Sequence, residues 1–180
     1  MSRARTFSNP ALVLSYRKIG EQDRIVVLLS QEQGKIRMIA KGVRKLTSSK
    51  KATLEPGNYV AAYGVVTKSM PLLTQAKMLD DCMSIRSNLQ KIRQLSQFLE
   101  ILDRLFVNQE LDDGMFDHIL NMRKLIVTDQ PTKASLLPKI DHMLTMLGYQ
   151  PLAETKHQSV MDYVAEITER PMKSWDYFKI

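Results

Sequence analysis

Near residue 81, the spacing of apolar residues changes from short runs typical of strands to the three- and four-residue steps typical of helices. Before this point, runs rich in aliphatic and β-branched residues are separated by Gly, Pro and polar residues, which predicts strands joined by turns. We expect five strands, at about 11–16, 24–29, 35–40, 59–67 and 72–79. Gly34 lies in the second turn, where a hairpin favours a glycine with positive φ. Five short strands in this length of chain predict a small barrel.

Four amphipathic helices are expected in the second part of the chain. The first carries regularly spaced apolar residues from Leu89 to Phe106, and the second begins after the N-cap chemistry of Asp112. The third runs to Leu147, with Gly148 as its C-cap, and a weaker fourth covers 160–169.

The fold class is therefore α+β, with an N-terminal barrel domain at residues 1–80 and an all-α domain at residues 81–180. The end of the chain carries three aromatic residues, Trp175, Tyr177 and Phe178. Apolar side chains must be covered, so this tail either docks on the helices or contacts a partner.

Basic residues are concentrated in the strand-forming part. Residues 1–80 contain 14 Lys and Arg against 5 Asp and Glu, a net charge of +9, whereas residues 81–180 contain 12 against 14, a net charge of −2. Such a surplus attracts polyanions. Nucleic acid and an anionic membrane surface are both candidate partners of the N-terminal domain.

The strongest functional signal is a run of cations that begins in the third expected strand and continues into a polar loop. Between Glu32 and Glu55 there are seven Lys and Arg and no carboxylate. The seven are Lys35, Arg37, Lys41, Arg44, Lys45, Lys50 and Lys51. Phosphate binding along a flexible loop and a solvated loop without a partner both fit this composition. Five upstream cations could extend the surface: Arg3, Arg5, Arg17, Lys18 and Arg24. For Arg24, an internal ion pair with Glu21 or Asp23 is an equally good explanation.

Four aromatic residues of the strand region, Phe7, Tyr16, Tyr59 and Tyr63, are candidates for stacking on bases. Aromatic residues more often fill cores, and we expect that role for most of them.

The search for catalytic motifs is negative: the chain has no phosphate-binding loop, dinucleotide fingerprint, zinc-protease helix or serine-hydrolase elbow. The pairs Asp80-Asp81 and Asp112-Asp113 could bind a metal ion, but both lie at element boundaries, where Asp caps helices. Cys82 is the only cysteine. The three histidines, without metal-ligand spacing, are His118, His142 and His157. We expect no enzyme, no metal and no cofactor.

No apolar run approaches the roughly 18 to 20 residues that cross a membrane, and the start of the chain lacks the apolar core of a secretory signal. A lone cysteine agrees with a reducing compartment. The expected location is the cytoplasm.

Several short motifs occur in a specific order and spacing. In the first part they read ALVL at 11–14, GEQDRIVVLL at 20–29, GKI at 34–36, AKGVRK at 40–45 and LEP at 54–56. In the second part they read FLEILDRL at 98–105 and MLGYQPL at 146–152. Together these motifs resemble the RecO family of bacterial recombination and repair mediators. The resemblance extends from about residue 5 to residue 152.

This resemblance implies an N-terminal OB-fold followed by a helical domain. It also implies binding of single- and double-stranded DNA and hence association with the nucleoid. The family's further roles are annealing of complementary strands and assistance in loading recombinase with RecR-like and single-strand-binding protein partners. The positions that match the family's DNA surface are Arg24, Lys35, Arg37, Lys41, Arg44 and Lys45. They coincide with the segment already suspected from its charge.

Two features depart from the family pattern. Many members carry zinc-binding cysteines after the motif at 146–152, where this chain reads AETKHQ at 153–158. The sequence also stops at Ile180, shorter than we expect of the family, so we expect a short form without a zinc site. The expected function is that of a non-catalytic DNA-binding mediator. The alternatives are a module whose barrel and helices dock repair or replication proteins, and a structure-specific nuclease that uses the Asp pairs.

Overall fold

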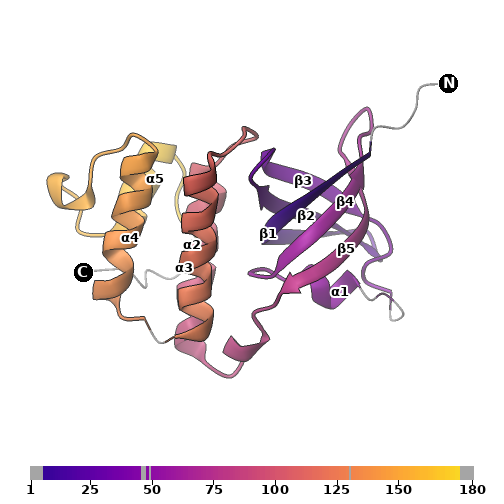
Figure 1. The fold of residues 1–180 in the computed structure, drawn as a ribbon, viewed down its shortest axis with the longest axis horizontal. Helices are drawn as coiled ribbons and strands as arrows, with labels where there is room; N and C mark the ends of the chain where they lie inside the picture. The colour runs from indigo at the N-terminus through magenta and orange to yellow at the C-terminus, as the bar shows by residue number, and fades with distance from the viewer. Residues whose placement is uncertain (1–5, 46–47, 49, 130, 175–180) are drawn as a thin grey trace. The chain divides into compact units, whose positions relative to one another are not determined.

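The computed structural model describes residues 6–45, 48, 50–129 and 131–174 (Figure 1). The chain divides into two compact units, one of Met1–Cys82 with Phe106–Leu111 and one of Met83–Leu105 with Asp112–Ile180. The aromatic residues of the tail lie outside the described residues: Trp175, Tyr177 and Phe178.

Five strands of the first unit form a closed barrel (Figure 1). The strands are β1 (Thr6–Ile19), β2 (Asp23–Ser30), β3 (Gly34–Ala40), β4 (Tyr59–Val65) and β5 (Leu72–Asp80), with the short helix α1 (Lys50–Thr53) between β3 and β4 in the chain. Their order around the barrel is β1-β2-β3-β5-β4. All neighbours pair antiparallel except β3 and β5, which are parallel. This is the five-stranded barrel of an OB-fold, so the expected fold class is confirmed.

Strand β1 is longer than its apolar run predicts because it pairs with two neighbours in succession. Residues 6–12 pair with β4 and residues 11–19 pair with β2, with a register shift between Val13 and Ser15. An irregularity of this kind bends a strand, which lets β1 turn from one neighbour to the other. The apolar pattern detects only the central part of β1, where both neighbours cover it.

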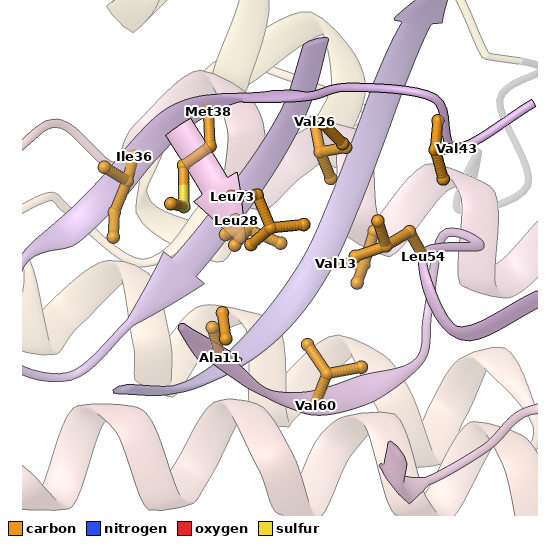
Figure 2. Packing of buried hydrophobic residues seen from close by; sticks show 12 residues of the cluster. Ala11, Val13, Val26, Leu28, Ile36, Met38, Val43, Leu54, Val60 and Leu73 are labelled. Atoms are coloured by element: carbon orange, nitrogen blue, oxygen red, sulfur yellow. The ribbon is translucent and has the colours of Figure 1, made fainter. Parts of the chain in front are cut away.

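Alternate strand residues fill the barrel interior (Figure 2). The interior residues labelled there on strands are Ala11, Val13, Val26, Leu28, Ile36, Met38, Val60 and Leu73. Two residues from outside the strands join them: Val43, from the loop after β3, and Leu54, which follows α1 and lies next to Val13 in this view. Burying one such side chain stabilises a fold by about 1.5 to 3 kcal/mol. The loop after β3 is therefore anchored in the barrel at both of its ends.

Helices make up the second unit. They are η1 (Met83–Ile85), α2 (Leu89–Leu105), α3 (Asp113–Thr128), α4 (Lys133–Met146), η2 (Leu152–Glu154) and α5 (Val160–Thr168). The four expected helices are present, and two expected caps are confirmed. Asp112 is the N-cap of α3 and its Oδ1 accepts the Met115 N–H at 2.8 Å. Gly148, with φ +84°, follows the C-cap Leu147 of α4 in the left-handed conformation that ends many helices.

The segment Phe106–Leu111 packs on the barrel instead of continuing α2. The Lys35 N–H donates to the Val107 carbonyl and the Leu111 N–H donates to the Gln31 carbonyl, both at 2.8 Å. Gly34, in the turn between β2 and β3, makes this approach possible, because a Cβ there would overlap the Val107 and Gln109 carbonyl oxygens. Gly34 also has the positive φ that its turn predicts, +61°.

A carboxylate of α2 holds the end of the described chain. Glu100 accepts the Lys173 N–H at 2.7 Å and the Ser174 N–H at 2.6 Å, and Arg104 Nη2 donates to Glu100 at 3.2 Å and to the Pro171 carbonyl at 2.9 Å. Burial of the carboxyl favours a higher pKa for Glu100, but the hydrogen bonds from Ser174, Lys173 and Arg104 outweigh it, and the pKa lies below the ordinary value.

We predict that Gly34→Ala is much more destabilising than Gly20→Ala. Gly20 also has a positive φ, +52°, but a Cβ there meets nothing within 4 Å, so its substitution costs only the left-handed conformation, about 1 to 2 kcal/mol. Gly34→Ala adds the displacement of residues 107–109, about 1 to 3 kcal/mol more. Urea unfolding of both variants measures the difference. Equal losses would show that the 106–111 segment does not pack on Gly34.

We also predict that the Lys173 and Ser174 amide protons report the titration of Glu100. Because the folded pKa is lowered, the anchoring is fully present above the pKa of an unfolded glutamate, about 4.3, and is lost as the pH falls through the lower folded value. The two amide proton shifts, followed by NMR, should change together below pH 4.3 and should not titrate in Glu100→Gln. A midpoint above 4.3 would contradict this account of the anchor.

Candidate nucleic-acid interface

Strand β3 separates core side chains from cations by simple alternation. Ile36 and Met38 are buried in the barrel, whereas Arg37 is exposed and Lys35 is half-buried on the outer face. Strand residues two apart on one face are separated by about 6.6 to 6.8 Å. The structure therefore places two of the predicted cations, Lys35 and Arg37, next to each other on the outer face of β3, and Lys41 directly follows the end of this strand.

Cross-strand pairing brings Arg17, one of the upstream cations that could extend the surface, onto the same face as the cations of β3. Arg17 pairs with Ile25, which pairs with Ile39, and Val27 pairs with Arg37. Directly paired residues point to the same side of a sheet. We call this outer surface of β1, β2 and β3 the basic sheet face; it carries Arg17, Ile25, Val27, Lys35, Arg37 and Ile39. The sequence suggested Arg17 by its charge, and the register of β1 gives its place on the face.

Residues 41–45 form what we call the basic loop. Lys41 and Lys45 are exposed, Arg44 is half-buried, and Val43 between them is buried in the barrel core. The loop therefore presents its cations outward while its apolar residue holds it in place.

Hydrogen bonds fix the basic loop beside the turn between β1 and β2. The Gly42 N–H donates to Asp23 Oδ1 at 2.7 Å and the Arg44 N–H donates to the Gln22 carbonyl at 2.9 Å. The Arg44 Nη1 donates to the Gly20 carbonyl at 3.1 Å. The prediction of a flexible loop is wrong for these residues, because three bonds and a buried valine position them.

Lys50 and Lys51 lie elsewhere on the barrel. Both belong to α1, and the Lys50 Nζ donates to the Thr74 carbonyl of β5 at 3.2 Å. Lys51 is exposed. Because β5 is separated from β2 by β3, these two lysines do not share the basic sheet face.

Arg24 must be removed from the candidate surface. Arg24 lies two residues before Val26, so the two side chains point to the same, inner side of β2. The Arg24 side chain is only 4% exposed, and its Nη1 lies 3.0 Å from Glu55 Oε1. The guanidinium carbon also lies 3.7 Å from the centroid of the Tyr16 ring. Arg24 is thus a buried structural cation, paired with Glu55 and not with the Glu21 or Asp23 that the sequence suggested. The spacing of two residues between Arg24 and the core residue Val26 was the signal in the sequence that could have shown that Arg24 is buried.

Six of the predicted cations have no carboxylate partner in the part of the chain that the structure describes. Among the described residues, no ion pair involves Arg37, Lys41, Arg44, Lys45, Lys50 or Lys51. Arg44 and Lys50 each donate a side-chain hydrogen bond to a backbone carbonyl oxygen. A carbonyl oxygen carries no net charge, so it does not neutralise the cation.

A groove opens beside β3, between this strand and the loop that joins β4 to β5. Its volume is about 420 Å³. Its walls include Lys35 and Arg37 of β3, Met70 and Pro71 of the β4–β5 loop, and Val107 and Asn108 of the 106–111 segment. Sequence reasoning missed all but the two cations, because the other walls come from distant parts of the chain.

The candidate stacking aromatics do not lie on the basic sheet face. Phe7 and Tyr16 pack against the barrel core. Tyr59 and Tyr63 are half-buried on β4, which is separated from β2 by β1 and from β3 by β5. The side chains between the cations of the face are therefore aliphatic.

Helix capping is confirmed for Asp112, while Asp80 is the last residue of β5.

Cys82 contacts the barrel unit through its side chain. The Cys82 thiol donates to the Pro56 carbonyl at 3.4 Å and lies 3.3 Å from Oδ1 of Asn58, a buried residue. The part of the chain that the structure describes contains no group of three or more His, Cys, Asp and Glu side chains able to hold a metal ion.

The histidines are less scattered than their sequence positions suggest. His118 Nε2 lies 2.8 Å from the Lys139 carbonyl, and its ring meets the His142 ring edge-on at 5.1 Å. His157 Nε2 lies 3.1 Å from Glu166 Oε2.

No helix among the described residues has both the length and the apolar character needed to cross a bilayer.

Comparison with known proteins places the barrel in a family. A family model described as "Recombination protein O N terminal" matches residues 1–81. The chain is 35% identical over 101 residues to "DNA repair protein RecO" of Heliobacterium modesticaldum, covering 56% of this chain and 37% of that protein. It is 29% identical over 152 residues to the protein of the same name from Nocardioides, covering 82% and 62%. A third match, from Cutibacterium acnes, is 40% identical over 74 residues, covering 41% and 30%.

These matches and the barrel show that residues 1–81 resemble the N-terminal domain of the RecO family, as the sequence motifs suggest. Over longer stretches, the chain is similar to DNA repair proteins of that name. It spans between about a third and three fifths of the length of these three curated relatives. The site residues Lys35 to Lys51 all fall within the matched residues 1–81, whereas Val107 and Asn108 fall outside them.

We predict that Glu55→Gln destabilises the barrel, because it leaves the Arg24 guanidinium buried without its carboxylate. Breaking a fully buried pair costs about 3 to 5 kcal/mol, and we expect about 2 kcal/mol here since Glu55 is 30% exposed. The measurement is the free energy of unfolding in urea. Glu21→Gln, a substitution of the same type on an exposed turn residue, should change it by less than about 0.5 kcal/mol. Similar values for the two variants would mean that the Arg24 pair is not structural.

Proposed function

We propose that this chain is a non-catalytic mediator of DNA repair and recombination that holds single- and double-stranded DNA through its phosphates. The observation that carries the proposal is the row of outward cations on β3 and the basic loop, set on the outside of an OB barrel. OB-folds bind nucleic-acid strands on the face of their second and third strands and on adjoining loops. The basic sheet face occupies the first of these positions, and the basic loop is hydrogen-bonded to the turn between β1 and β2.

Phosphate contacts explain the kind of binding we expect. Each cation that neutralises a phosphate releases condensed counterions, which favours binding at low salt for any sequence. Such contacts position a strand and do not read its bases. Binding should therefore be independent of sequence and steeply weakened by salt.

Annealing follows from the same electrostatics. Two complementary strands repel each other through their phosphates, and cations that neutralise part of this charge on one protein surface let them approach. As in the family that the chain resembles, the proposed role includes help in loading recombinase, with RecR-like and single-strand-binding proteins as partners. No catalytic step is part of this proposal.

The alternative of a protein-docking barrel predicts a different response to salt. Contacts that are mainly apolar are screened little by ions, whereas phosphate contacts weaken steeply. A nuclease is less well supported, since one of its candidate carboxylates, Asp112, already caps α3.

We predict that Lys41→Glu with Lys45→Glu slows annealing of complementary oligonucleotides several-fold and makes the salt dependence of single-strand binding shallower. Loss of two contacts should reduce the slope of log K against log salt by about 1.4, at about 0.7 per contact. The measurements are fluorescence anisotropy over a range of ionic strength and quenching of a labelled strand on annealing. Both lysines are exposed, so neither substitution alters the barrel core.

The matched control is Lys124→Glu with Lys139→Glu, which changes the net charge equally on exposed positions of the helical unit. If the two double variants bind and anneal alike, net charge alone acts and the proposed interface is wrong. Unchanged annealing in the Lys41 and Lys45 variant would refute the annealing mechanism by itself.

A further inference from the structure

The groove beside β3 exists because β3 and β5 close the barrel over a single residue pair. Ile39 pairs with Leu72, and the Ile39 N–H donates to the Pro71 carbonyl at 2.9 Å. Toward the start of β3, the Lys35 N–H bonds to Val107 of the 106–111 segment instead of to another strand. The groove lies between these two attachments, beside Arg37.

The lining of the groove combines cations with apolar residues. Lys35 and Arg37 supply the cations, while Ile36, Met70, Pro71 and Val107 supply apolar surface. No carboxylate is among the described residues that line the groove. Val107 is 60% exposed.

The backbone of β3 adds a donor and an acceptor. Successive strand residues direct their N–H and C=O groups to opposite edges. Since Lys35 and Ile39 direct theirs away from β2, toward Val107 and Pro71, Arg37 between them directs its own into the groove. The Asn108 amide and the Ser69 side chain lie in the same lining.

We propose that this groove holds one unpaired nucleobase of a single strand whose neighbouring phosphates lie on Lys35 and Arg37. The inference rests on the DNA binding proposed above and adds a preference to it. A base has an apolar face, a polar edge and an attached anion, which match the apolar wall, the Arg37 backbone and the two cations. The volume of about 420 Å³ lies within the range of small-molecule sites, about 300 to 1,000 Å³.

Two consequences follow. Bases of a duplex are paired and stacked, so only a single strand, or a strand end, can fill the groove. The apolar wall comes in part from Val107, which lies outside the residues that match the family model, so the segment after α2 contributes to DNA binding.

The test compares a thymidine oligonucleotide with an abasic oligonucleotide of the same length and the same number of phosphates, in fluorescence anisotropy on the full chain. We expect the thymidine strand to bind about fivefold more tightly, the low end of base-stacking effects because the wall is aliphatic and not aromatic. Equal affinity for the two strands would overturn the inference and leave the phosphate proposal intact. Failure of both strands to bind would instead overturn the proposed function.

The double variant Met70→Ser with Val107→Ser should bring the ratio of the two affinities close to one without changing the affinity for the abasic strand. The control is Leu79→Ser, a comparably exposed apolar residue of β5 that is 46% exposed and does not line the groove. Leu79→Ser should keep the wild-type ratio. A groove that serves a protein segment would give a ratio near one in the wild type, and a ratio unchanged by the double variant would place the base elsewhere; either result contradicts the inference.

Discussion

Every residue of β3 faces either the interior of a closed barrel or its outer surface, and this alternation determines both the core and the candidate interface. Ile36 and Met38 are held inside by packing from the other strands, so Lys35 and Arg37 must lie outside. A slip of one residue would exchange the two sets and bury two cations, which no neighbouring carboxylate of β3 could neutralise. The apolar core therefore positions the charged surface, and the two cannot be changed independently.

The same constraint explains why one arginine differs from the other basic residues. Arg24 points to the same side of β2 as Val26 and Leu28, so its side chain is buried. The Glu55 carboxylate and the face of the Tyr16 ring compensate this burial. Arg37, on the neighbouring strand, points to the outer side of the sheet and remains exposed. Charge in a sequence thus identifies candidate binding residues. The side of the strand on which each residue lies then decides whether it is a surface residue or a buried structural one.

The sequence predicts most of the local structure because strands and helices leave periodic signals: the five strands, four helices, the Asp112 cap and the positive φ of Gly34 and Gly148 all follow from nearby residues. It predicts the site less well. The place of Arg17 depends on pairing between strands, and the ion pair of Arg24 joins residues 31 positions apart. The groove needs three distant segments, including one that looks like the continuation of a helix. Such contacts depend on tertiary packing, which leaves no period in the sequence.

The most direct test of the central claim is to map the backbone amide shifts of the full chain by NMR while a short single-stranded oligonucleotide is added at low salt. If β3 and the basic loop form the interface, the largest changes should fall on residues 35–45 and on Arg17, with small changes in α3 and α4. Changes concentrated on the helical unit, or spread evenly over both units, would contradict the claim that the outer surface of β3 is where this protein meets DNA.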